Sequence, residues 1–197
     1  MRRSVAWLKS EPIGIEFAEI EVTDRLSARG VAIGTAPVSY RLDYELNTAA
    51  GYATTELRAT ARGEGWRRDL VLRRDSSGTW TIAADQDGEI NLPSAGGNAT
   101  LLAGAIDCDL ELSPVTNMMP ILRHGLVDGG GPIDLMMAWV AVPALTVQPD
   151  AQRYCHMNSS TERTVVRYEA IDGDFAADIT LDSDAVVIDY PGVARRL

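Results

Sequence analysis

Cysteine and histidine are scarce in this chain. Its 197 residues include two cysteines, Cys108 and Cys155, and two histidines, His124 and His156. Two cysteines cannot build the disulfide framework of a small secreted domain, and in a reducing compartment they remain thiols. Only the two histidines offer an imidazole base near neutral pH, and a lone histidine is more often a structural hydrogen-bonder than a catalyst.

Catalytic motifs are missing as well. The sequence contains no G-x-S-x-G, no H-E-x-x-H and no C-x-x-C. The glycines at 129–131 are followed by Pro132 and lack the helix start that a phosphate-binding loop needs. We therefore expect a protein that is not an enzyme and that needs no cofactor.

Basic residues and long apolar runs are both few. The chain has 18 Lys and Arg against 28 Asp and Glu, a net charge of −10, so nucleic acid and anionic membranes are not expected partners. The first apolar run ends at Leu8, before Lys9 and Glu11, and is too short for an export signal. No stretch of about 20 apolar residues could form a membrane span. We expect a cytoplasmic protein.

What the chain does contain is alternation of apolar and polar residues, which is typical of antiparallel strands with one buried face. It is clearest at residues 38–46, 165–170, 175–182 and 186–190. Residues 135–142 are continuously apolar, which fits a strand buried on both faces or a short helix inside a sheet. The flanking Pro132 and Pro143 favour the strand. The pattern predicts an all-β, mainly antiparallel fold.

Two stretches of the chain resemble each other. Residues 63–75 (GEGWRRDLVLRRD) parallel residues 172–184 (DGDFAADITLDSD). The simplest account is a duplication with halves at roughly 1–95 and 101–197; chance similarity between two amphipathic strands is the alternative. Because two β-rich halves must bury their apolar faces, we expect a single domain over residues 1–197: one large curled sheet, or roll, closing toward a barrel.

The segment from Asp107 to His124 (DCDLELSPVTNMMPILRH) carries the most information. It begins as a strand with Asp107, Asp109 and Glu111 on one face. The strand breaks at Ser113–Asn117, where polar side chains can bond the backbone, and is expected to resume after Pro120.

A required metal is not predicted. Alternate carboxylates on one strand lie about 7 Å apart, which is too wide for one small cation without other ligands. Residues 85–89 (DQDGE) look like a calcium loop but lack the remaining ligands, so a tight turn is expected there.

The acidic strand and the turn together resemble a family of bacterial glycolipid-binding proteins, with an acidic D-x-D-L strand followed by S-P-x-T-N-x-x-P-I-R-R. Leu122 stands where that pattern has its first arginine. Residues 139–143 (WVAVP) and 189–192 (DYPG) extend the resemblance over most of the chain. It implies a long roll with an interior and a glycolipid or lipid-like ligand.

Candidate ligand-binding residues follow from these patterns. A tryptophan face suits acyl chains and sugar rings, inward carboxylates could accept bonds from sugar hydroxyls, and polar groups after the turn could recognise a head group. The candidates are Trp66, Asp107, Asp109, Glu111, Asn117 and Arg123. Trp139, inside its apolar run, is expected in the core.

Three functional hypotheses remain open at this point. The first is non-catalytic binding of an amphipathic small molecule in the interior. The second is a small enzyme in which Asp109 or Glu111, buried in an apolar cavity, acts as general acid or base. The third is an interaction module with a filled interior. An inward carboxylate beside an open cavity would favour the enzyme, and a packed interior would favour the interaction module.

Overall fold

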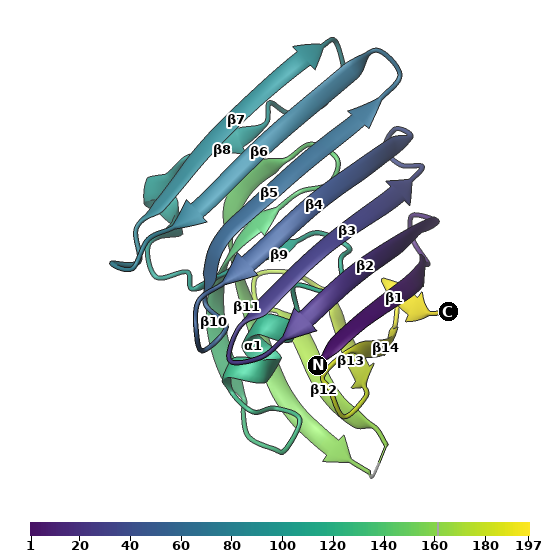
Figure 1. The fold of residues 1–197 in the computed structure, drawn as a ribbon, viewed down its shortest axis with the longest axis vertical. Helices are drawn as coiled ribbons and strands as arrows, with labels where there is room; N and C mark the ends of the chain where they lie inside the picture. Colours follow the sequence, from purple (N-terminus) through teal and green to yellow (C-terminus); the bar gives the residue numbers. More distant parts are fainter. Residues whose placement is uncertain (161) are drawn as a thin grey trace.

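The strands form one large sheet that curls on itself. The structure is a computed structural model that describes residues 1–160 and 162–197. Its sheet has 15 strands, nearly all antiparallel, and runs in the order β7-β6-β5-β4-β3-β2-β1-β15-β14-β13-β12-β11-β10-β9, with β8 beside β11. Figure 1 shows β1–β7 in front and the green strands of the C-terminal half behind them. The predicted all-β fold is confirmed; the sheet curls but does not close.

The N-terminal half is an antiparallel meander joined by short turns. Its strands are β1 (Arg2–Lys9), β2 (Gly14–Val22), β3 (Leu26–Gly34), β4 (Tyr40–Thr48), β5 (Thr54–Gly63), β6 (Trp66–Arg74) and β7 (Trp80–Gly88). The alternation predicted for residues 38–46 appears in β4, whose even-numbered residues are all buried. Residues 85–88 of the expected turn at 85–89 instead form the end of β7, paired with β6.

The C-terminal half returns to the middle of the sheet. It contains β8 (Gly96–Gly97), the 3-10 helix η1 (Ala99–Leu102), β9 (Asp107–Leu110), α1 (Met118–Arg123), β10 (Ile133–Val140), β11 (Thr146–Ser159), β12 (Thr164–Ala170), β13 (Ala176–Leu181), β14 (Val187–Tyr190) and β15 (Ala194–Arg196). The last strand pairs with the first, with Leu8 opposite Arg195. The two similar stretches both fall on antiparallel hairpins, β5–β6 and β12–β13. Their duplication stays a prediction.

The prediction that a strand resumes after Pro120 is wrong, because residues 118–123 form the short helix α1. Pro120 lies in the first turn of this helix, where its missing N–H would have no partner within the helix in any case. Pro120 is therefore compatible with the first turn of a helix as well as with a break in a strand. The helix packs its Met118, Met119 and Ile121 side chains into the core.

Two glycines on the inner face of β3 make room for tyrosines of β4. A Cβ on Gly30 would lie 2.3 Å from the ring of Tyr44, and one on Gly34 would lie 2.4 Å from the ring of Tyr40. Because neither glycine has a side chain, both rings lie flat across β3. Tyr44 thereby reaches β2, where its hydroxyl donates to Glu16.

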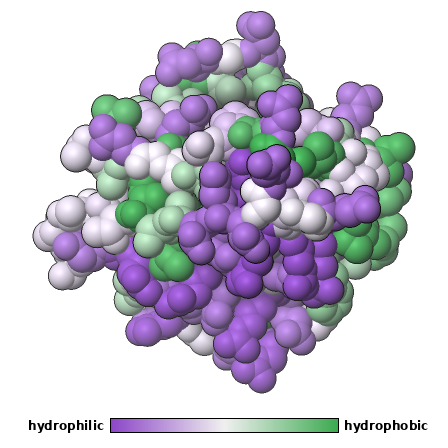
Figure 2. All heavy atoms as spheres, turned by 90° about the horizontal axis from the view of Figure 1, so that it is seen from above, coloured by the Kyte–Doolittle hydropathy of each residue, from purple (hydrophilic) through white to green (hydrophobic). Residues whose placement is uncertain are grey.

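The surface carries both hydrophilic and exposed hydrophobic residues. From above, hydrophilic residues cover most of the visible face and hydrophobic ones form separate groups (Figure 2). In the described residues no helix has the length and apolar character needed to cross a membrane. Cys108 and Cys155 are both free thiols.

Candidate functional site

A cavity of about 520 Å³ lies where the loop after β9 faces the C-terminal strands. Its lining combines carboxyl groups, the start of the S-P-V-T-N turn and several aromatic rings. The lining residues are Glu11, Asp109, Leu110, Glu111, Leu112, Ser113, Asn117, Trp139, Asp150, Tyr168, Ala170, Phe175, Tyr190, Gly192 and Val193. The lining includes the exposed Glu11, Phe175 and Gly192, so the cavity opens to solvent.

Asp109 is held in place by two hydrogen bonds. Its carboxylate accepts from Thr116 Oγ1 at 2.7 Å and from Gln152 Nε2 at 2.7 Å. Burial raises the pKa of Asp109, the two hydrogen bonds lower it, and the negative charges of Asp150 and Asp107 raise it further. The side chain thus meets the cavity as a fixed acceptor that gains a proton more easily than an ordinary aspartate.

Glu111 lies two residues further along the chain. Its carboxylate accepts a hydrogen bond of 2.6 Å from the backbone N–H of Val142. Burial raises the pKa of Glu111, while this hydrogen bond and the positive charge of Lys9 lower it. Burial and the charges of Glu111 and Glu16 also raise the pKa of Tyr40 to about 12.

A chain of buried polar groups fixes the beginning of α1. Asn117 Nδ2 donates to the hydroxyl of Tyr154 at 2.8 Å, and that hydroxyl donates to Gln152 Oε1 at 3.1 Å. Gln152 Nε2 then donates to both Asp109 and Asp150. The amide of Asn117 therefore does not cap its helix but connects the turn to β11.

A buried ion pair anchors the turn from the other side. Lys9 Nζ lies 3.0 Å from Glu16 Oε2, and their side chains are 1% and 0% exposed. Glu16 Oε1 accepts hydrogen bonds from Ser113 Oγ at 2.6 Å and from the Tyr44 hydroxyl at 2.7 Å. The N-terminal half thus holds the loop that shapes the cavity.

Aromatic rings form the opposite wall. The centroid of Tyr168 lies 5.9 Å from that of Phe175 and 5.9 Å from that of Tyr190, and Phe175 lies 6.1 Å from Tyr190. Trp139, half-buried on β10, lines the same cavity and stands opposite Asp109 in the parallel β9–β10 pair. Aromatic faces and fixed carboxylates therefore meet in one space.

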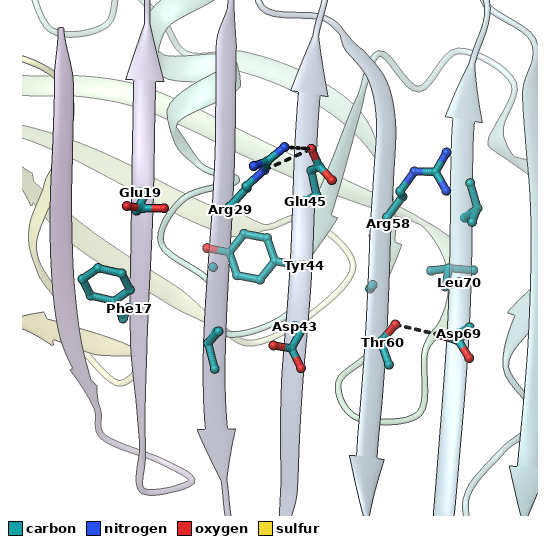
Figure 3. A pocket seen from close by; sticks show the side chains of 14 residues that line it. Phe17, Glu19, Arg29, Asp43, Tyr44, Glu45, Arg58, Thr60, Asp69 and Leu70 are labelled. Carbon is teal, nitrogen blue, oxygen red and sulfur yellow. Dashed lines mark hydrogen bonds and ion pairs between the residues drawn. The ribbon is translucent and has the colours of Figure 1, made fainter.

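A second depression, of about 460 Å³, lies on the outer face of β2–β6 (Figure 3). Two of its charged side chains, Arg29 and Glu45, pair with each other at 2.9 Å, and Thr60 donates to Asp69 at 2.6 Å. The Arg29–Glu45 pair is exposed to solvent, where ion pairs are weak. We therefore place the candidate site in the inner cavity.

Comparison with known proteins identifies the family. The family model described as "putative glycolipid-binding" matches residues 4–196, which include every residue that lines the cavity. The protein belongs to this family. A crystal structure of a DUF1089 family protein from Pseudomonas aeruginosa is 27% identical and covers 92% of each chain with a TM-score of 0.70. No curated protein matches the chain.

Three of the six sequence-predicted residues of this glycolipid-binding family member meet at the cavity: Asp109, Glu111 and Asn117. The three carboxylates predicted on one strand face do not all line the cavity. Asp107, at its start, is buried beneath α1 and accepts a hydrogen bond from Arg123 Nη2. Arg123 also donates to the carbonyls of Gly51 and Tyr52. Asp107 and Arg123 therefore attach α1 to the β4–β5 turn and do not line the cavity.

The predicted locations of Trp66 and Trp139 are both wrong. Trp66, expected at the ligand, is 6% exposed in the core beside Gly63 and does not line the cavity. Trp139, expected in the core, is half-buried and lines it. The sequence around Trp139 is continuously apolar, so it predicted burial for every residue of the strand. Such a run does not show which of its side chains other segments cover.

Proposed function

We propose that the inner cavity binds an amphipathic ligand with a sugar-like head group and that the protein performs no chemistry on it. The observation that carries the proposal is the meeting of Trp139 and three other aromatic rings with fixed carboxyl groups in one open cavity. The family description, which names glycolipid binding, supports it. A volume of about 520 Å³ lies within the usual range for small-molecule sites.

The two walls suit the two parts of such a ligand. Aromatic rings offer large apolar faces to acyl carbons or to the C–H face of a sugar. Carboxylates accept hydrogen bonds from hydroxyl groups, and charged acceptors make the stronger bonds. Because Asp109 is already positioned by Thr116 and Gln152, its side chain would lose little conformational entropy on binding.

Trp139 gives a direct test of this proposal. Of the four tryptophans, Trp7, Trp66 and Trp80 are buried in the core, so a ligand in the cavity should change mainly the fluorescence of Trp139. We expect decyl glucoside, titrated below its micelle concentration, to bind, and Trp139→Ala to weaken binding about fivefold by calorimetry, since one aromatic contact contributes about 1 kcal/mol.

The matched control is Trp80→Phe, which changes a tryptophan whose Nε1 donates to Ala105 outside the cavity. This variant should keep the affinity of the wild type. Equal affinities for wild type and a folded Trp139→Ala variant would place the ligand elsewhere and contradict the proposal.

One observation favours the enzyme as a second candidate. Asp109 and Glu111 line an open cavity, and burial raises the pKa of both, which is how a carboxyl group becomes a general acid or base near neutral pH. The test is long incubation of concentrated protein with p-nitrophenyl glycosides. Turnover that Asp109→Asn or Glu111→Gln abolishes, and that outer-face Asp69→Asn keeps, would establish the enzyme. The binding proposal expects no release of nitrophenol.

A further inference from the structure

The cavity has an unbalanced negative charge. Four of its lining residues are acidic: Glu11, Asp109, Glu111 and Asp150. Among the described residues, no lysine, arginine or histidine lines it. The nearby cation, Lys9, is buried against Glu16 and does not reach the space. An anionic head group would meet carboxylates without a compensating charge.

Three aromatic rings line the same cavity as these carboxyl groups. Tyr168, Phe175 and Tyr190 lie with their ring centroids about 6 Å apart in each pair and are tilted to one another by 43° to 63°. Asp109 and Asp150 line the same cavity as Tyr168, and their negative charges raise the pKa of Tyr168 beyond the effect of burial. Asp150 is itself fixed by a 2.8 Å hydrogen bond from Gln152.

Aromatic faces and carboxylates both attract positive charge. The face of an aromatic ring attracts a cation within about 6 Å, and several tilted rings around one point are the arrangement that binds quaternary ammonium groups. A neutral sugar would use the carboxylates as acceptors but would leave their charges uncompensated.

We infer that the head group of the ligand carries a positive charge, as an amino sugar or a quaternary ammonium group does, and that its ammonium lies between the rings of Tyr168, Phe175 and Tyr190 and the carboxylates of Asp109 and Asp150. This inference rests on the proposed function, because it presumes that the cavity holds an amphiphile.

Three probes with the same chain and different head groups test it: decyltrimethylammonium, decyl glucoside and decyl sulfate. Each is titrated below its micelle concentration, at physiological ionic strength, by calorimetry and by Trp139 fluorescence. We expect the ammonium probe to bind about tenfold more tightly than the glucoside, and the sulfate to show no binding.

Two variants locate the ammonium. Phe175 is 41% exposed, so Phe175→Leu should fold normally. Both Phe175→Leu and Asp150→Asn should weaken the ammonium probe about fivefold or more and the glucoside much less. Glu45→Gln removes a carboxylate from the outer depression and is the control for general attraction to an acidic protein. It should leave all affinities unchanged.

The outcomes separate the two ideas. If the glucoside binds as tightly as the ammonium probe, or Glu45→Gln weakens the ammonium probe as much as Asp150→Asn does, the charged head group is overturned and the binding cavity stands. If none of the three probes binds the folded protein, the proposed function fails together with the inference.

Discussion

Replacing Lys9 by methionine is expected to lower the free energy of unfolding by about 3–5 kcal/mol, the usual cost of leaving a buried charge without its partner. Methionine fills a similar volume but leaves the Glu16 carboxylate, which is fully buried, without a cation. The hydrogen bonds from Ser113 and Tyr44 remain, but they do not replace the positive charge. Urea unfolding followed by circular dichroism measures the change.

The double variant Lys9→Met with Glu16→Gln is the decisive control. It removes both charges and keeps an acceptor for Ser113 and Tyr44, so it should recover most of the lost stability. Arg29→Met, which breaks the exposed Arg29–Glu45 pair of Figure 3, should cost far less. If Lys9→Met is as mild as Arg29→Met, the buried pair does not form as described.

The strands could be predicted because their signal is local. In β4, buried and outward-facing residues alternate one by one, and this alternation is visible in the sequence without knowledge of any partner strand. The helix α1 could not be predicted in this way. Its apolar side chains face a core built by other segments, and Pro120 is compatible with either structure.

Only part of the candidate site could be predicted, because only its local part leaves a pattern in the sequence. Asp109, Glu111 and Asn117 belong to one continuous motif, so the sequence drew attention to them. The bond from Ser113 to Glu16 joins residues 97 positions apart, and no local pattern marks Lys9 and Glu16 as its support. Whether Trp139 is covered likewise depends on other segments, because the side chains that line the cavity with it come from β9, β11, β12, β14 and the loops around them.

Replacing Arg123 by methionine should cost about 3 kcal/mol near neutral pH, because the buried Asp107 loses its cation. Arg123 donates to Asp107 and also holds the carbonyls of Gly51 and Tyr52, so α1 loses its attachment to the β4–β5 turn. Burial raises the pKa of Asp107, and Arg123 and then His124 oppose that rise. Without Arg123 the pKa of Asp107 rises further.

The raised pKa of Asp107 makes the stability of the Arg123→Met variant depend on pH. A carboxyl group whose pKa is higher in the folded state holds a proton that the unfolded chain releases, so stability falls as pH rises between the two pKa values. The deficit of Arg123→Met should therefore be small at about pH 4, near the ordinary pKa of an aspartate, and large at about pH 7.5. Adding Asp107→Asn removes the titrating group and should leave only the lost bonds to Gly51 and Tyr52, at a cost independent of pH. Equal deficits for Arg123→Met at both pH values would show that Asp107 bears no buried charge.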